Sequence, residues 1–223
     1  MQARAYSAGS HVVFGEDEYS PHSWEGRQIL AHVVQQTRQG GCQRSPQSLQ
    51  RMPATSDCTA TDISEITAAY PVAQAMVSKA YRVIGATPTP AVDALLMKYF
   101  NDDSVSTRLH TLIGYNNLIS GMAGSFTLEC EHVGNFMYDW FCGGSNAYVR
   151  VIPINIHLCE AAFGRSVNNL AETIIHECSH KFDNTGDEAY CSGGCPASLD
   201  RWDAYDNADS FSKFAWEAYT TIP

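Results

Sequence analysis

The chain has 223 residues, of which 44% are hydrophobic and 17% are charged, a balance typical of soluble globular proteins. This length suits one substantial domain with a short appendage. No stretch of about 20 apolar residues is available, so we expect no membrane insertion. Asp and Glu total 24 against 14 Lys and Arg, and a net charge of −10 disfavours nucleic acid as a partner because it repels phosphates.

The first 57 residues differ in composition from the rest of the chain. The amino end lacks the basic start and the apolar run of a Sec signal, so we expect another export route or an already removed leader. Residues 37–57 are rich in Gln, Arg, Ser, Gly and Pro and cannot bury enough surface to fold alone. The sequence therefore predicts a segment over 1–36, a linker over 37–57 and a domain over 58–223.

Apolar residues from Cys58 onward recur at helical spacing. They predict helical core segments that Pro71 kinks or divides, and further helices near residues 94–100 and 109–121. Between residues 125 and 160 the pattern changes to the alternation of strands. We therefore expect an α+β fold, dominated by helices, with a small β-sheet or hairpin.

Residues 166–183 are predicted to form a helix, because Ser166 suits an N-cap and apolar residues recur every four positions. His176 and His180 share another face, so that both imidazoles can reach one ion. Glu177 stands beside them, where it can take a proton from metal-bound water. This His-Glu-x-x-His pattern predicts a hydrolytic metal site, and two ordinary histidines on a helix are the alternative.

A catalytic zinc needs three protein ligands and an open position for water. After His180 a turn containing Asn and Gly folds the chain back toward the metal, which makes Asp187 the best candidate for the third ligand. Glu188 is the second choice. Tyr190 can aim its phenol at the same site and stabilise the oxyanion that forms as water adds to a peptide carbonyl.

The sequence from His176 to His180, followed by Thr185 to Tyr190, resembles the signature of the aspzincins, the family of deuterolysin and the fungal peptidyl-Lys metalloendopeptidases. The similarity spans about residues 58–220. It implies a zincin-like metalloprotease fold with an HExxH active-site helix and a Zn2+ cofactor. It also implies the roles of five residues: zinc ligands His176, His180 and Asp187, general base Glu177 and electrophilic helper Tyr190.

Residues 206–210 resemble the Asn-Ala-Asp-Ser segment of the peptidyl-Lys branch. In that branch the Asp of this segment, here Asp209, works in the substrate pocket with a Glu three residues later, here Ser212. One of the two carboxylates is therefore missing. The resemblance implies a loose preference for a basic residue after the scissile bond, which Lys213 weakens further. A helix N-cap or first-turn acid is an equally weighted interpretation of Asp209.

The amino-terminal segment has a resemblance of its own. Residues 12–21 and 25–36 resemble the leader metallopeptidase-like domain of many bacterial toxins and contractile-injection cargo proteins. Four residues of the usual pattern are absent, which leaves His32 without a second histidine or a glutamate. A single imidazole cannot hold a catalytic zinc, so the segment is interpreted as a shortened, inactive remnant. The resemblance implies a bacterial effector, secreted or injected, with an export apparatus as a partner.

Eight cysteines are more than a cytosolic protein of this size needs, so we expect disulfides and an oxidising compartment. Cys178 lies on the core side of the helix and is predicted to be a buried free thiol. The family resemblance implies the first of three pairs, and we predict the other two: Cys58–Cys130, Cys142–Cys159 and Cys191–Cys195.

The predicted function is a zinc-dependent endopeptidase that acts on protein or peptide substrates. The alternative is a non-catalytic binding module stabilised by a structural zinc, for which the cysteines offer ligands. Glu177 and Tyr190 argue against this alternative, since hydrolysis needs them and structure does not. A nuclease is disfavoured by the acidic balance. Five histidines without metal spacing are expected to be ordinary surface or core residues: His11, His22, His110, His132 and His157.

Overall fold

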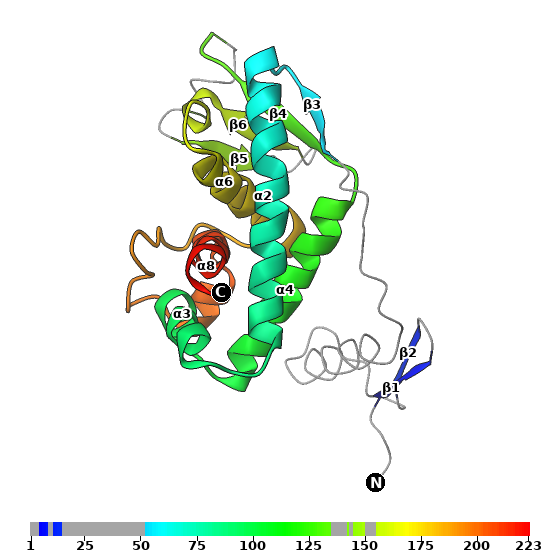
Figure 1. The fold of residues 1–223 in the computed structure, drawn as a ribbon, viewed down its shortest axis with the longest axis vertical. Coiled ribbons are helices and arrows are strands. Elements are labelled where there is room, and N and C mark those ends of the chain that lie inside the picture. The colour runs from blue at the N-terminus through cyan, green and yellow to red at the C-terminus, as the bar shows by residue number, and fades with distance from the viewer. Residues whose placement is uncertain (1–4, 9–10, 15–51, 135–141, 143–144, 150–154) are drawn as a thin grey trace. The chain divides into compact units, whose positions relative to one another are not determined.

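The computed structural model describes residues 5–8, 11–14, 52–134, 142, 145–149 and 155–223 (Figure 1). Internal contacts divide the chain into two compact units, Met1–Gln47 and Ser48–Pro223. In the first unit, β1 (Ala5–Ala8) and β2 (His11–Phe14) form an antiparallel pair. The rest of the predicted leader, including His32, lies outside the described residues. Among the described helices, none is long and apolar enough to cross a membrane.

The longest helix of the second unit is α2 (Ala60–Gly85), which begins with a capping box between Thr59 and Asp62. The helix continues through Pro71, so of the two predicted effects, a kink or a division, the division is wrong. Its buried face packs against three other helices, α4 (Val105–Ala123), α6 (Val167–Asp183) and α8 (Ala208–Thr221). This packing outweighs the one backbone hydrogen bond that proline removes. In Figure 1 the strands of the second unit lie near the N-terminal end of α2, whereas α3 (Pro90–Phe100) lies near its C-terminal end.

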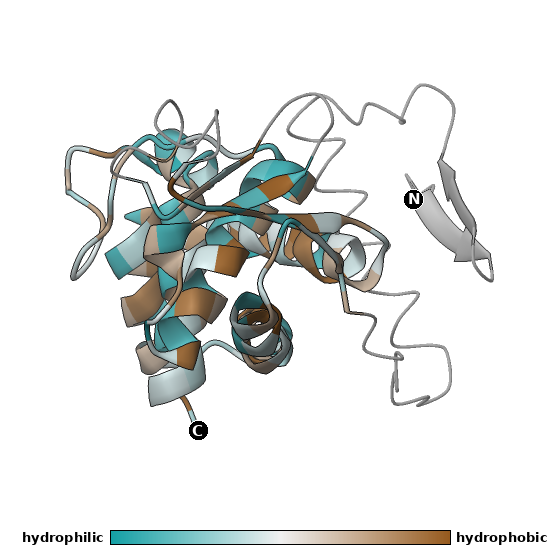
Figure 2. Ribbon diagram, turned by 90° about the horizontal axis from the view of Figure 1, so that it is seen from above, coloured by the Kyte–Doolittle hydropathy of each residue, from teal (hydrophilic) through white to brown (hydrophobic). Residues whose placement is uncertain are grey.

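Side-chain caps fix the starts of the neighbouring helices. Thr89, Ser104 and Ser166 each accept a backbone N–H bond in the first turn of the helix that follows. Each helix carries apolar and polar residues, as the mixed colours in Figure 2 show. The helices are α3 (Pro90–Phe100), α4 (Val105–Ala123), α6 (Val167–Asp183), α7 (Arg201–Tyr205) and α8 (Ala208–Thr221), with a short 3-10 helix at Glu160–Ala162.

One mixed sheet of four strands completes the unit, in the order β3-β4-β6-β5. Its strands are β3 (Ala54–Ser56), β4 (Thr127–Glu131), β5 (Ala147–Val149) and β6 (Ile156–Cys159). Both β3 and β6 run parallel to β4, and β5 is an antiparallel edge strand beside β6. Residues 54–56, which the sequence analysis placed at the end of a linker, thus form an edge strand. Three residues without a long apolar pattern give no strand signal of their own.

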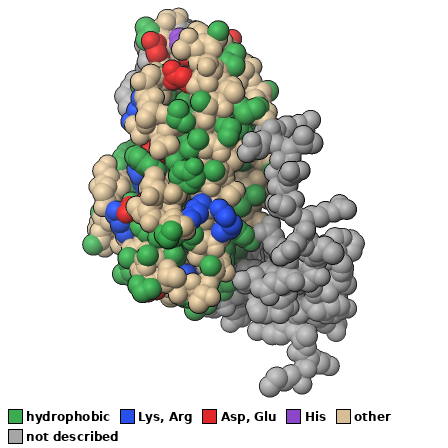
Figure 3. All heavy atoms as spheres, viewed as in Figure 1, with side chains coloured by type: hydrophobic (Ala, Val, Ile, Leu, Met, Phe, Trp, Pro, Cys, Tyr) green, Lys and Arg blue, Asp and Glu red, His purple; other side chains and the backbone are tan. Residues whose placement is uncertain are grey.

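The core lies between the helices and one face of the sheet. The inward side chains Leu128 and Cys130 on β4 and Ile156 and Leu158 on β6 are fully buried. On α6, the predicted apolar stripe packs into the same core. On the described face in Figure 3, side chains of both charges lie among apolar ones. This architecture confirms the helix-dominated α+β fold class with a small sheet.

The disulfides of the described residues include one long-range link and two local ones. The three predicted pairs are confirmed, and Cys178 is the free, buried cysteine of the described residues. The first pair joins the start of α2 to β4, and the others close shorter loops, as follows: Cys58–Cys130, Cys142–Cys159 and Cys191–Cys195.

Candidate metal centre

Helix α6 carries His176 and His180 on consecutive turns, and their Nε2 atoms lie 3.1 Å apart. The Nδ1 atom of each ring faces a different acceptor. For His180 this acceptor is the carbonyl oxygen of Thr185, at 2.7 Å, and for His176 it is Oδ1 of Asp209, at 2.9 Å. A ring that donates its Nδ1 proton keeps the lone pair of Nε2 for a metal. Both imidazoles are therefore oriented as ligands toward the same point.

The chain returns to this point directly after α6 ends. Asn184 adopts a left-handed conformation (φ 58°) at the C-cap, and Gly186 then forms a parallel bridge with Asn207. This return places Oδ1 of Asp187 3.0 Å from Nε2 of His176 and 3.4 Å from Nε2 of His180. Glu188 is exposed and does not line the cleft. The geometry thus brings Asp187, and not Glu188, together with the two histidines.

The three ligand atoms are spaced as a tetrahedral zinc site requires. Bonds of 2.0 to 2.1 Å in a tetrahedron put ligand atoms about 3.3 Å apart, close to the separations between the described groups. The described cluster offers three ligands and not the four of a closed structural site, so it fits a catalytic zinc better than a structural one. Burial lowers the pKa of His176, but hydrogen bonds to Asp187 and Asp209 outweigh it and raise this pKa to about 10. The carboxylates therefore make the cluster strongly attractive to cations.

Glu177 lies beside the cluster and is only 4% exposed. Its Oε2 atom is buried and has no hydrogen-bond partner in the described part of the chain. Burial raises the pKa of this carboxyl to about 7, with His176 opposing the shift and the negative charge of Asp187 adding to it. An unpartnered carboxyl with a pKa near neutrality is suited to taking up and releasing a proton.

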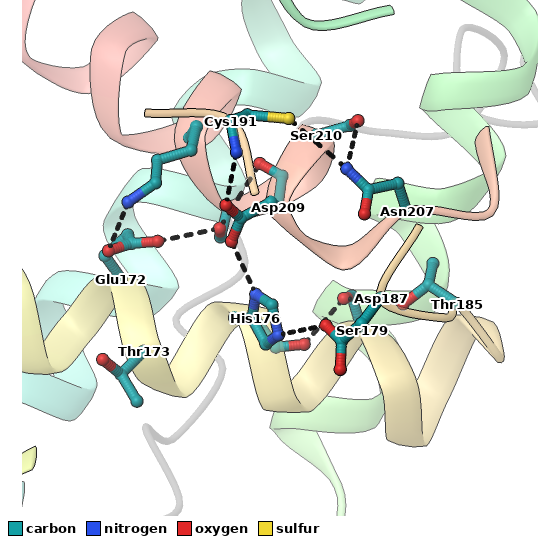
Figure 4. A network of polar contacts seen from close by, with 12 residues as sticks. Glu172, Thr173, His176, Ser179, Thr185, Asp187, Cys191, Asn207, Asp209 and Ser210 are labelled. Atoms are coloured by element: carbon teal, nitrogen blue, oxygen red, sulfur yellow. Dashed lines mark hydrogen bonds and ion pairs between the residues drawn. The ribbon is translucent and has the colours of Figure 1, made fainter. Parts of the chain in front are cut away.

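Asp209 stands in the first turn of α8, where its carboxylate is buried and doubly engaged. Oδ1 accepts the bond from His176, and Oδ2 accepts the backbone N–H of Cys191 at 2.8 Å (Figure 4). The structure places Asp209 as a first-turn acid of α8 whose carboxylate also contacts the candidate ligand His176.

Ser212 does not line the cleft of the candidate ligands. It contacts Glu172, which was not among the predicted site residues. The hydroxyl of Ser212 donates to Oε1 of Glu172 at 2.9 Å, and Nζ of Lys213 lies 3.0 Å from Oε2 of the same carboxylate. Glu172 precedes His176 by four residues on α6. Helical spacing alone could therefore have placed Glu172 on the face of the two histidines.

A cleft of about 690 Å3 is lined by the two histidines and by the charged side chains described above other than Glu188, but not by Ser212. Tyr190 stands at its wall and is 76% exposed, and the negative charge of Asp187 is the main cause that raises the pKa of its phenol. The cleft is lined by β5 and the residues before it, α6, the loop after α6, and α8, and it includes these charged side chains: Arg165, Glu172, Glu177, Asp187, Asp209 and Lys213.

His157 does not line the cleft and lies in a buried polar network on β6. Its Nδ1 atom is 3.0 Å from Oε1 of Glu131, and its ring stacks on Tyr148 with the centroids 4.5 Å apart. The residue is 1% exposed. This burial suits a core residue, but the expectation that His157 has no metal-ligand neighbours is wrong, because Glu129 and Glu131 lie close enough for the three side chains to hold a metal ion.

Comparisons with known proteins identify the family and the fold. The aspzincin family model, described as lysine-specific metallo-endopeptidase, matches residues 87–216, more than half of the chain. A model described as the eCIS core domain matches residues 1–40, the segment that resembles the leader of injected proteins. A solved zinc peptidase from Grifola frondosa shares the fold, with a TM-score of 0.60, 24% identity and coverage of 72% of this chain and 97% of that chain. No curated protein matches the chain in sequence.

Proposed function

The chain belongs to the aspzincin family of zinc metallo-endopeptidases, and we propose that it hydrolyses peptide bonds of protein substrates in the cleft beside His176, His180 and Asp187. Zinc is its cofactor. One observation carries the proposal of this site: three ligand atoms converge next to the unpartnered Oε2 of Glu177. A structural zinc module has no use for such a buried acid.

The residues around the cluster have the properties that hydrolysis needs. Zinc held by this set would lower the pKa of a water molecule and polarise the scissile carbonyl. Glu177 takes the proton of the attacking water and passes it to the leaving amine. The exposed phenol of Tyr190 donates a hydrogen bond to the oxygen of the carbonyl as negative charge develops there. Asp209 holds the ring of His176 in the ligating tautomer.

A loose preference for a basic residue after the scissile bond remains part of this proposal. Its support is the position of two carboxylates, Asp209 and Glu172, in the wall of the cleft. The side chain of Ser212, predicted to contact substrate, would act through its hydrogen bond to Glu172.

We also propose that residues 1–36 form a degenerate leader, that 37–57 connect it to the enzyme with 54–56 joining the sheet as β3, and that 58–223 form the rest of the peptidase domain. The match of residues 1–40 supports the role of an exported bacterial effector or toxin that uses an injection apparatus. The three disulfides support an extracellular destination, since such bonds persist in oxidising compartments.

Zinc content and hydrolysis, measured together, test the proposed site. The purified protein should bind about one zinc ion per chain and cleave casein, and a chelator should abolish cleavage until zinc is restored. Asp187→Ala should lose zinc and activity, whereas the matched control Glu188→Ala should keep both. Tight zinc binding without cleavage of casein or of a peptide library would show a binding module instead.

A further inference from the structure

An internal ion pair lies in the part of the cleft wall, here called the arm, that Glu172 on α6 and Lys213 on α8 form. Nζ of Lys213 lies 3.0 Å from Oε2 of Glu172, and the side chains are 22% and 13% exposed. The other oxygen of Glu172 accepts the hydroxyl of Ser212 at 2.9 Å, which fixes the carboxylate in place. Figure 4 shows Glu172 on the same helix as His176 and beside α8.

The pair lies within reach of a bound substrate. Glu172 precedes His176 by one helical turn, a rise of about 6 Å along α6. Glu172 and Lys213 both line the cleft that contains the metal ligands. A substrate side chain next to the scissile bond that enters this arm would therefore contact the ion pair.

The charges of this arm are already compensated within the protein. Both oxygens of Glu172 have partners, and so do both oxygens of Asp209, which accept bonds from His176 and the backbone of Cys191. Asp209 is thereby committed to the metal centre. A substrate cation can approach the carboxylate of Glu172, which is already paired with the ammonium group of Lys213.

We propose that Glu172 is the specificity carboxylate of the cleft and that Lys213 occupies it as an internal substitute for a basic substrate side chain. This inference rests on the proposed peptidase function. An incoming ammonium or guanidinium must displace Nζ of Lys213, which exchanges one ion pair for another of similar strength. The exchange gains little, so the native enzyme discriminates weakly in favour of basic residues.

Profiling of cleavage sites in a peptide library tests the pair. Lys213→Met unmasks Glu172 and should raise the enrichment of Lys and Arg next to the scissile bond about fivefold over the native enzyme. Glu172→Gln leaves Lys213 without its partner and should shift the enrichment toward Asp and Glu. The double variant should show neither enrichment.

The pair Lys98–Glu217, with 2.6 Å between Nζ and Oε2, offers a matched control outside the cleft. Lys98→Met removes the same charge and should leave the cleavage profile unchanged. A Lys213→Met profile equal to that of the native enzyme would overturn the inference. If Lys213→Met does not fold, Lys213→Gln, which retains a polar end, should give the same shift.

A binding measurement separates failure of this inference from failure of the proposed function. In the zinc-loaded Glu177→Gln background, fluorescence anisotropy gives the affinities of peptides that differ only in one Lys, norleucine or Glu. Adding Lys213→Met should raise the ratio of Lys to norleucine affinity about fivefold. An unchanged ratio would refute the role of the pair. If the native zinc-loaded protein did not hydrolyse peptides, the proposed peptidase function would be refuted, but the role of the ion pair in binding would not.

Discussion

Two hydrogen bonds determine which nitrogen each imidazole offers to the metal centre. The carbonyl of Thr185 accepts only from a ring that is protonated at Nδ1, and the carboxylate of Asp209 favours the same tautomer in His176. Both Nε2 atoms then face Asp187, the arrangement in which they could bind one metal ion together with its carboxylate. The ligand geometry thus depends on residues outside the ligand set.

Replacement of Glu177 by Gln should separate metal binding from chemistry. The amide keeps the shape of the side chain but cannot take up a proton, so kcat/KM for a peptide should fall about 100-fold to 10,000-fold while zinc content stays unchanged. Glu188→Gln, an exposed neighbour, serves as the control for lost charge. Full activity of a zinc-loaded Glu177→Gln variant would rule out this residue as the base.

Asp209→Ala should weaken zinc binding about 10-fold to 100-fold, because His176 loses the partner that orients its ring. Competition with a chelator of known affinity measures this change. The exposed Asp203→Ala on α7 is the matched control. If zinc affinity stays constant while cleavage preference changes, Asp209 contacts substrate and does not position the ligand.

At the scale of elements, α6 serves the core and the site with different faces. Leu170, Ile174 and Cys178 pack into the core, while Glu172 and His176 face the cleft. The helix ends at Asp183, a position where the helix dipole disfavours a negative charge. Burial raises the pKa of Asp183 to about 6, and the negative charge of Asp206 adds to this shift. The side-chain amide of Asn117, which donates a hydrogen bond to the carboxylate, opposes the shift.

This raised pKa predicts a pH-dependent effect of Asp183→Asn. The protonated carboxyl stabilises the fold below its ordinary pKa of 3.8, and this contribution is lost as the pH rises through about 6. Relative to the native protein, the variant should therefore gain up to about 3 kcal/mol of unfolding free energy between pH 4 and pH 8. Urea unfolding at both pH values measures the gain. The control variant Asp103→Asn, at an exposed position, should show no such gain in unfolding free energy. An equal effect of Asp183→Asn at both pH values would show that Asp183 does not titrate between them.

At the scale of the whole molecule, the second compact unit starts before the strand that completes its sheet. Residues from Ser48 belong to this unit, and β3 pairs with β4 from Ala54 onward. The peptidase domain proposed from the sequence begins at Cys58 and so excludes β3.

A chain that starts at Ser48 should therefore retain zinc content, peptidase activity and thermal stability. A chain that starts at Cys58 loses the hydrogen bonds of β3 to β4 and should unfold at a lower temperature. Differential scanning calorimetry of both chains in the zinc-loaded form measures the difference. Equal stability of the two chains would show that β3 contributes nothing to the fold.

The sequence by itself determined what depends on short spacings along the chain. The separation of four positions between His176 and His180 places both rings on one helical face whatever the surroundings. The turn after α6, which contains Asn184 and Gly186, allows Asp187 to return. The helix-dominated α+β class and the buried thiol of Cys178 followed from periodicity in the same way.

Only the tertiary structure decided the contacts between segments that are distant in sequence. The pairing of β3 with β4, the continuity of α2 through Pro71 and the partners of Asp209 all depend on how packed elements meet. Glu172 and Lys213 lie 41 positions apart on different helices, and their ion pair exists because α6 and α8 pack together. Such contacts carry no local signal, since burial in the folded core supplies the free energy that selects them.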